Sequence, residues 1–320
     1  MDKMNEFSKL FKKVGGFSLI KDYIKSNVFF LAVSQFLLLG SSKKALEIVR
    51  LSTQLKIQKR LEKRYINILR NFQNEIVINQ ESKSNKTVWI CWLQGIENAP
   101  ELVKKCYQSI CKHLNDWNII VITCENLADY TEFPEYIIEK WQNGIISNTH
   151  FSDLLRLELL TRHGGLWIDS TVLCTGKVPE YITESELFLF QCLKPGLDGH
   201  CILGSNWLIY SKSNNIVLLA VKKLLLDYWE KNNHLVDYFI FHHFMSITLR
   251  YFDKEWNKIP KVPNDLPHVL LLQLFDEYDD NKYNHIKQFT SFHKLSYKQD
   301  KSDMEKKNTF YDVIINQNKY

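Results

Sequence analysis

The sequence lacks the signatures that would place it at once in several large classes of protein. It has no Walker A motif, and no G-x-G-x-x-G follows its first expected strand, so neither a P-loop nor a dinucleotide fold is indicated. It also has no low-complexity segment and no recognised nucleic-acid-binding motif. We therefore expect an ordinary globular protein with no nucleic-acid partner.

Disulfide frameworks and membrane spans are also missing. The seven cysteines form no C-x-x-C pair, and their odd number fits a reduced, cytoplasmic setting. The longest apolar run, residues 28–39, is interrupted by Ser34 and Gln35 and is shorter than the roughly 20 residues that a bilayer requires. A long polar leader precedes this run and no clean cleavage site follows it, so we expect no signal peptide.

The charge of the chain is unevenly distributed. Up to residue 85 there are sixteen Lys and Arg against seven Asp and Glu, a net charge of +9, whereas the remainder carries −4. Residues 1–26 have the pattern of a short amphipathic helix, and residues 41–74 that of one long basic helix or two. We expect this region to contact an anionic partner. For residues 28–39 two interpretations stay open: a buried helix, or an interfacial segment seated on anionic lipid.

A polar stretch at 80–86 divides the sequence into a basic helical region, 1–85, and an α/β domain, 86–320. Apolar strands are expected at 87–93 and 117–123, with an amphipathic helix between them. This order is typical of an α/β sheet with crossover connections. Later segments continue the pattern, with strands expected at 187–193 and 206–210 and helices at 215–231 and 235–251.

The most informative stretch is residues 152–171, S-D-L-L-R-L-E-L-L-T-R-H-G-G-L-W-I-D-S-T. Ser152 is typical of a helix N-cap, and the Gly-Gly pair ends the helix. The apolar run 166–168 is too short for another helix, so we interpret it as a buried strand. That strand would deliver Asp169 to its carboxyl end, where ligands of open α/β sheets gather.

Three charged side chains are expected to converge at this strand end. Asp153 and Arg156 lie three residues apart on one helix face, and Asp169 arrives from the strand that packs beside that helix. Spacing alone favours the simpler interpretation, a surface Asp–Arg helix pair and an unrelated turn aspartate. The spacing therefore leaves a site and a solvated pair as alternatives.

The stretch as a whole is similar to the core motif of glycosyltransferase family 32 and its relatives, which include bacterial capsular polysaccharide synthesis proteins and the large clostridial glucosylating toxins. That motif reads S-D-x-x-R, a leucine-rich stretch, G-G, an aromatic, one residue and then D-x-D. Thr171 replaces the second D-x-D carboxylate, a variant that resembles the capsular polysaccharide branch. The residues in register are Ser152, Asp153, Arg156, Gly164, Gly165, Trp167 and Asp169.

The resemblance covers about residues 86–275 and leaves the N-terminal helical region outside it. It implies a GT-A-type, Rossmann-like domain that binds a nucleotide-sugar. The first strand carries a similar W-I-x-W-x-Q-G element, which implies that Trp92 and Gln94 contact the nucleotide, together with Gly165 of the core motif. Ser205-Asn206-Trp207 resembles the family's S-N segment at the donor-sugar face.

The resemblance also implies roles for the charged residues. Asp153, Arg156 and Asp169, with Asn206, would form the catalytic set, and the three charged residues would also hold the donor. A Mn²⁺ or Mg²⁺ ion, the cation such transfer commonly uses, would be held by Asp169 and Thr171. His268, in a Pro-His element near the family's C-terminal end, would complete that site.

We predict a glycosyltransferase of the hexosyltransferase type. It would move a sugar from a nucleotide-sugar, a UDP-sugar by preference, to a lipid-linked oligosaccharide in capsular or exopolysaccharide biosynthesis, with retention of anomeric configuration. It would be cytoplasmic and peripheral on the inner face of the cell membrane. Two alternatives stay open: a toxin-like protein glycosyltransferase, and a catalytically inactive sugar-binding or scaffold protein of a polysaccharide assembly complex.

Overall fold

The computed structural model describes residues 23–75, 83–194, 196 and 199–320. Most of the amphipathic helix expected within residues 1–26 lies outside the described residues, as does part of the boundary expected at 80–86. The described chain begins with two helices that pack against each other, α3 (Phe29–Leu39) and α4 (Lys43–Glu75). The basic segment expected to form one helix or two is thus a single helix.

A five-stranded sheet lies at the centre of the α/β domain, in the order β2-β1-β3-β6-β5. β1 is parallel to β2 and to β3, while β6 is antiparallel to β3 and to β5. The parallel strands therefore end at the same edge of the sheet. The strands are β1 (Thr87–Cys91), β2 (Asn118–Ile122), β3 (Gly165–Ile168), β5 (Leu187–Gln191) and β6 (Gly204–Ser211).

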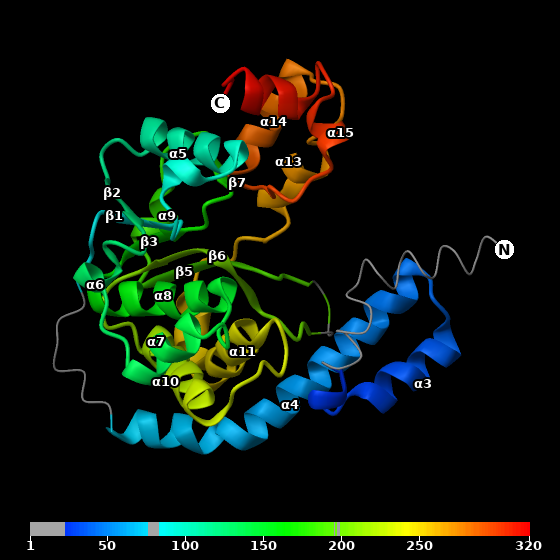
Figure 1. Cartoon of the computed structure of the whole chain (residues 1–320), viewed down its shortest axis with the longest axis vertical. Helices are drawn as coiled ribbons and strands as arrows, with labels where there is room; N and C mark the ends of the chain where they lie inside the picture. The colour runs from blue at the N-terminus through cyan, green and yellow to red at the C-terminus, as the bar shows by residue number, and fades with distance from the viewer. Residues whose placement is uncertain (1–22, 76–82, 195, 197–198) are drawn as a thin grey trace.

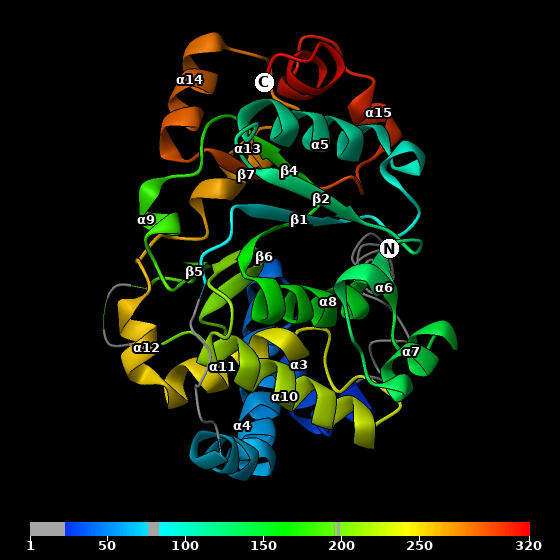
Figure 2. The same cartoon turned by 90° about the vertical axis from the view of Figure 1, so that its left-hand side faces the viewer.

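Helices cover both faces of this sheet, with α5 (Glu101–His113) on one side and α8 (Asn148–His163) on the other (Figure 2). Successive residues of a strand point to opposite faces. In β1, Val88 joins the core on the α5 side, whereas Trp89 joins the core on the α8 side. β3 and β5 are fully buried because both faces of the sheet are covered, whereas most of β2, at the edge of the sheet, is only partly buried. The predicted α/β fold with crossover connections is confirmed.

The core on the α8 side extends to α10 (Ile216–Lys231), α11 (Ile240–Tyr251) and α4 (Figure 1). Three side chains of α4, Ile57, Leu61 and Tyr65, are buried in it. The N-terminal helical region is therefore packed on the α/β domain, and the predicted division at residue 85 stays a prediction.

A second, two-stranded sheet joins distant parts of the chain. β4 (Val172–Cys174) directly follows the central motif and pairs antiparallel with β7 (Phe292–Lys294), with Val172 opposite Lys294. The remaining elements are η1 (Ile96–Asn98), α6 (Leu127–Tyr130), α7 (Glu135–Gln142), α9 (Glu180–Thr183), α12 (Asp253–Lys258), η2 (Leu266–His268), α13 (Val269–Leu272), α14 (Asp280–Phe289), α15 (Lys301–Met304) and η3 (Asp312–Asn316).

Two helix starts differ from the expectation. Ser147, and not Ser152, caps α8, because its side chain accepts a hydrogen bond from the N–H of His150. Asp153 therefore lies in the second turn of the helix rather than the first. α11 begins at Ile240 instead of 235, since Asp237 accepts a hydrogen bond from the N–H of Phe239 in the preceding turn.

The apolar segment 28–39 forms a helix whose surface is largely open. Within α3 only Ala32 is buried, whereas Phe30, Leu37 and Leu38 are 83%, 77% and 82% exposed. The buried-helix interpretation of this segment is therefore wrong. None of the helices in the described part of the chain has the length and apolarity needed to cross a bilayer.

Candidate active site

A pocket of about 540 Å³ lies at the carboxyl ends of β1 and β3. A second hollow of about 820 Å³ adjoins it toward the end of β2, and Leu93 and Gln94 line both. Such strand ends are where α/β sheets bind ligands. The smaller pocket brings together five of the predicted site residues: Trp92, Gln94, Arg156, Asp169 and Thr171.

Helix α8 contributes a buried ion pair to this site. Nη2 of Arg156 lies 3.2 Å from Oδ1 of Asp153, and the two residues are only 4% and 7% exposed. The guanidinium carbon lies 4.9 Å from the ring centre of Trp167 and 5.6 Å from that of Phe241, within the range of cation–π contacts. The pair is therefore desolvated, and removal of either partner would leave an uncompensated buried charge. The alternative of a solvated surface pair is excluded.

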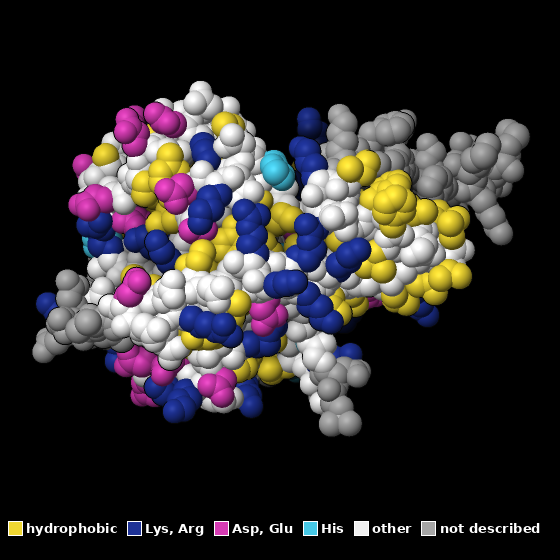
Figure 3. Space-filling view, turned by 90° about the horizontal axis from the view of Figure 1, so that it is seen from below, with side chains coloured by type: hydrophobic (Ala, Val, Ile, Leu, Met, Phe, Trp, Pro, Cys, Tyr) yellow, Lys and Arg dark blue, Asp and Glu magenta, His cyan; other side chains and the backbone are white. Residues whose placement is uncertain are grey.

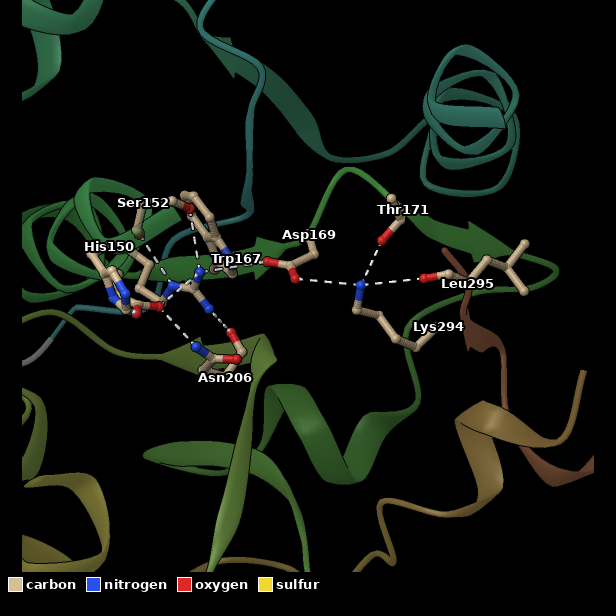
Figure 4. Close-up of polar contacts among 10 residues, drawn as sticks. His150, Ser152, Trp167, Asp169, Thr171, Asn206, Lys294 and Leu295 are labelled. Carbon is tan, nitrogen blue, oxygen red and sulfur yellow. Dashed lines mark hydrogen bonds and ion pairs between the residues drawn. The ribbon is translucent and has the colours of Figure 1, made fainter. Parts of the chain in front are cut away.

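Asn206 and Ser152 complete the hydrogen bonding of this ion pair (Figure 4). Nδ2 of Asn206 donates to Oδ1 of Asp153 at 2.8 Å, and Nη1 of Arg156 donates to the backbone carbonyl of Asn206. Nε and Nη2 of Arg156 donate to the backbone carbonyl and the hydroxyl of Ser152, at 3.2 and 3.3 Å. Each guanidinium nitrogen thus has a fixed partner, which orients Arg156 toward the pocket.

Asp169 lies just beyond β3, as predicted, and its side chain is held between two cationic groups. Its Oδ1 accepts a hydrogen bond of 3.0 Å from Nε1 of Trp167 and lies 3.7 Å from Nη2 of Arg156. Its Oδ2 lies 3.6 Å from Nζ of Lys294. Its backbone N–H donates to the carbonyl of Trp207 at 2.8 Å, which anchors the strand end to β6.

Lys294 is the site residue that sequence reasoning missed. It reaches the pocket from β7, and its Nζ donates to Oγ1 of Thr171 at 2.5 Å although 123 positions separate the two residues. No local pattern could have found it, because only the pairing of β4 with β7 brings it here. Tyr238, Tyr297 and Lys298 also line the pocket, and they were not among the predicted site residues either.

Gly165 does not reach the pocket, although the family resemblance implied that it contacts the donor. It lies at the start of β3, at the opposite end from Asp169. Its φ is +104°, and an added Cβ would lie 2.5 Å from the carbonyl oxygen of Thr87. Glycine is required there for the close approach of β3 to β1, which is a packing role.

His268 is not part of the pocket lining either. Its Nδ1 donates to the backbone carbonyl of Asn264 at 2.7 Å, and its ring packs edge-on against Trp207 with 6.0 Å between ring centres. These contacts hold His268 as a structural residue behind β6.

The side chains around Asp169 and Thr171 do not fit a divalent cation. The Lys294 ammonium lies between them, so a metal ion bound there would meet a like charge at close range (Figure 4). Across residues 23–75, 83–194, 196 and 199–320 there is also no cluster of three or more His, Cys, Asp or Glu that could hold a metal ion. The side chains present at this position therefore do not form the expected Mn²⁺ or Mg²⁺ site of Asp169, Thr171 and His268.

Two curated proteins are similar to part of this chain. O-glycosyltransferase braB of Annulohypoxylon truncatum is 28% identical over 134 residues, covering 36% of this chain and 32% of braB. O-glycosyltransferase PaGT of Phomopsis amygdali is 30% identical over 95 residues, covering 27% of this chain and 23% of PaGT. The chain thus matches about a third or less of the length of these relatives.

Two solved structures also align with the fold. The PaToxG glycosyltransferase is 14% identical with a TM-score of 0.37, and the alignment covers 81% of this chain and 97% of that one. The glycosyltransferase GlyE of Streptococcus pneumoniae TIGR4 is 14% identical with a TM-score of 0.37, covering 73% of this chain and 63% of that one.

A family model matches most of the chain. The model of the capsular polysaccharide synthesis protein family matches residues 41–314. This range includes α4, so the similarity extends beyond the expected 86–275 and takes in the helical region that we had placed outside it. It also contains the central motif and the strand that carries Lys294. The chain belongs to the capsular polysaccharide synthesis protein family.

Proposed function

We propose that this protein is a glycosyltransferase that moves a sugar from a nucleotide-sugar, a UDP-sugar by preference, to a lipid-linked oligosaccharide in capsular or exopolysaccharide synthesis. Its family and the glycosyltransferases to which it is similar support the reaction class. One observation carries the assignment of the site: Trp92, Arg156 and Asp169 converge in one pocket at the carboxyl ends of β1 and β3.

The nucleotide would bind where the two hollows meet, beside Trp92 and Gln94. Trp92 offers an aromatic surface, and its ring packs edge-on to Tyr297 with 5.9 Å between ring centres. Its Nε1 is buried and has no hydrogen-bond partner among the described residues. A buried donor without a partner costs free energy, and a ligand oxygen would satisfy it.

Transfer breaks the bond between C1 of the sugar and the diphosphate oxygen, and the electron pair stays on that oxygen. The acceptor hydroxyl forms the new bond to C1, and its proton passes to the departing diphosphate. Negative charge grows on the diphosphate during this step, so a fixed cation such as Arg156 stabilises it. Asp169 would accept hydrogen bonds from sugar hydroxyls, while Asp153 and Asn206 position Arg156. We include retention at C1, which the family resemblance implies and product NMR would test.

Attachment to the anionic inner face of a membrane is part of this proposal. Figure 3 shows hydrophobic side chains gathered over α3, beside a row of Lys and Arg side chains. α4 carries nine Lys and Arg against three Glu, and all nine basic residues are exposed. An apolar face flanked by basic residues fits an anionic lipid surface. The seven cysteines are all unpaired, which agrees with a reducing compartment.

Consumption of UDP-, GDP- and CDP-sugars by the purified full chain tests the proposal, and lipid-linked oligosaccharides serve as acceptors. We expect one donor to be consumed, and consumption to fall at least about a hundredfold in Asp169→Asn and Arg156→Lys. Lys282→Ala, which removes an exposed charge on α14, serves as the control and should match the wild type. A folded protein that binds a donor but consumes none would instead be the sugar-binding or scaffold protein.

A further inference from the structure

The ammonium of Lys294 lies between the two positions at which a D-x-D motif places carboxylates. Nζ is 2.5 Å from Oγ1 of Thr171 and 3.6 Å from Oδ2 of Asp169 (Figure 4). A second carboxylate at position 171 would pair with this ammonium and neutralise it. The threonine hydroxyl only accepts a hydrogen bond, so it holds the Lys294 side chain in place and adds no second negative charge to that of Asp169.

The backbone fixes this arrangement. The N–H of Leu295 donates to the carbonyl of Thr171 at 2.9 Å, and Lys294 pairs with Val172 in the β4–β7 ladder. Leu295 is only 2% exposed and belongs to a core that includes Leu173 and residues of α13, α14 and η3. The Lys294 side chain is itself only 21% exposed. Lys294 is thus a positioned group and not a mobile surface lysine.

Lys294 has bonding capacity left for a ligand. An ammonium carries three N–H donors. Two of them are used by Oγ1 of Thr171 at 2.5 Å and the carbonyl of Leu295 at 3.4 Å. Oδ2 of Asp169, at 3.6 Å, lies beyond hydrogen-bond distance. The third donor is therefore available to an oxygen that enters the pocket.

The pocket carries a net positive charge, which favours an anionic ligand. Its charged lining residues are three cations, Arg156, Lys294 and Lys298, and one anion, Asp169. Asp153, buried behind the lining, pairs with Arg156, and one net positive charge still remains. This excess attracts a diphosphate and repels a divalent cation. Oxygens of a diphosphate can accept from Lys294 on one side and from Arg156 on the other, because Asp169 separates the two cations.

We infer that Lys294 binds the diphosphate of the donor and supplies the positive charge for its departure, so that binding and transfer need no divalent cation. The inference rests on the proposed function. When the bond between C1 and the diphosphate oxygen breaks, the electron pair remains on that oxygen, and the ammonium stabilises it through a hydrogen bond. Lys294 keeps its own proton throughout, and the acceptor's proton leaves with the diphosphate.

Titration calorimetry with UDP, GDP and CDP tests this, in EDTA and in Mn²⁺. The wild type should bind one of them with a Kd that agrees within about twofold between the two buffers. Lys294→Ala should weaken binding roughly tenfold to a hundredfold in both, as expected for a lost charge-assisted hydrogen bond. Lys294→Arg should keep most of the affinity because it keeps the charge, and Lys282→Ala should not differ from the wild type.

Two carboxylate variants separate ligand binding from a structural role of Lys294. In Thr171→Asp the new carboxylate should pair with the ammonium and weaken binding in EDTA, although Lys294 is still present. In Thr171→Asp with Lys294→Ala, two carboxylates remain without the lysine, so binding should become dependent on Mn²⁺. Thermal melting of each variant monitors folding, and Lys294→Arg and Thr171→Asp still test the inference if Lys294→Ala does not fold.

Several outcomes would overturn the inference. Wild-type binding that requires Mn²⁺ and disappears in EDTA would do so while leaving the proposed glycosyltransferase intact. An unchanged Kd in Lys294→Ala would likewise overturn the inference and leave the proposed glycosyltransferase intact. If the folded wild type bound none of the three nucleotides in either buffer, both the inference and the proposed function would fail.

Discussion

The side-chain amide of Asn206 donates a hydrogen bond of 2.8 Å to Asp153, although 53 positions separate the two residues. This bond ties β6 to α8 beneath the pocket. The same Asp153 oxygen lies 3.2 Å from Nη2 of Arg156. Asn206 is therefore a positioning residue for the guanidinium.

We predict that Asn206→Ala lowers the free energy of unfolding by about 1–3 kcal/mol, because it leaves an oxygen of a buried carboxylate with one partner fewer. Asn206→Asp should cost more, since it places a second negative charge beside Asp153. Urea unfolding of both variants measures the change. Equal stability of Asn206→Asp and Asn206→Ala would contradict the buried, charged state of Asp153.

Gly165→Ala should be strongly destabilising. Its Cβ would lie 2.5 Å from the carbonyl oxygen of Thr87, and its φ of +104° disfavours any side chain. We expect a loss of about 3 kcal/mol or more, measured by urea unfolding. Gly144→Ala is the matched control, because Gly144 has a φ of +72° but open space around it. It should cost only about 1 kcal/mol. Similar losses in both variants would show that crowding between β1 and β3 is not the cause.

Burial of His293 should make the protein less stable in mild acid. His293 is 0% exposed, and burial lowers its pKa from 6.5 to about 4. Between these values the unfolded chain binds a proton that the folded protein excludes, so stability is complete above pH 6.5 and falls as the pH drops toward 4. The loss from this residue should reach about 2 kcal/mol at pH 5.

The measurement compares urea unfolding at pH 7 and pH 5 in the wild type and in His293→Gln. Glutamine can keep the 2.9 Å contact that Nε2 makes with Oγ1 of Thr175, but it does not titrate. Stability of the variant should therefore depend less on pH, by the amount assigned to His293. The exposed His285→Gln on α14 is the control and should keep the wild-type dependence. If the stability of His293→Gln fell between pH 7 and pH 5 as much as that of the wild type, His293 would not be the source of the pH dependence.

Removal of one apolar side chain from α3 should weaken binding to anionic vesicles. Leu38→Glu is expected to reduce sedimentation with vesicles of phosphatidylcholine and phosphatidylglycerol about tenfold or more, because it removes apolar contact and adds a repelled charge. Leu272→Glu is a matched control on α13, since Leu38 and Leu272 are 82% and 80% exposed. Leu272→Glu should bind as the wild type does.

Equal effects of the two substitutions, or wild-type binding that is independent of phosphatidylglycerol, would contradict the membrane proposal. A third outcome is possible: the wild type binds no vesicles but forms a concentration-dependent dimer that Leu38→Glu abolishes. That outcome would identify a second copy of the chain as the partner of α3.

Much of the sheet and half of the site could be read from local sequence. The Gly-Gly pair, the short apolar run and Asp169 predict the end of α8, the strand β3 and the position of Asp169 just beyond it correctly, because each depends on neighbouring residues. Trp92 and Gln94 reach the pocket for the same reason, since they directly follow β1. Local patterns of this kind determine an element and the edge at which it ends.

Other features depend on contacts that a local pattern does not contain. Ser147 and Ser152 are both suitable caps by residue type, and in the structure the side chain of Ser147 makes the capping hydrogen bond. The apolar residues of α3 carry no information about which other part of the protein packs on them. A buried and an exposed helix were therefore equally compatible with the sequence. Lys294 reaches Thr171 through strand pairing across 123 positions, which no periodicity indicates.

The pairing of β4 with β7 has a consequence for the order in which the protein is made. β4 leaves the ribosome soon after the central motif, but its partner strand, with Lys294, is synthesised more than a hundred residues later. A nascent chain can fold the five-stranded sheet while its pocket still lacks this cation. The full positive charge of the pocket therefore appears only after the segment with β7 has been synthesised, and proteolytic loss of residues 292–298 would remove the ammonium groups of Lys294 and Lys298 again.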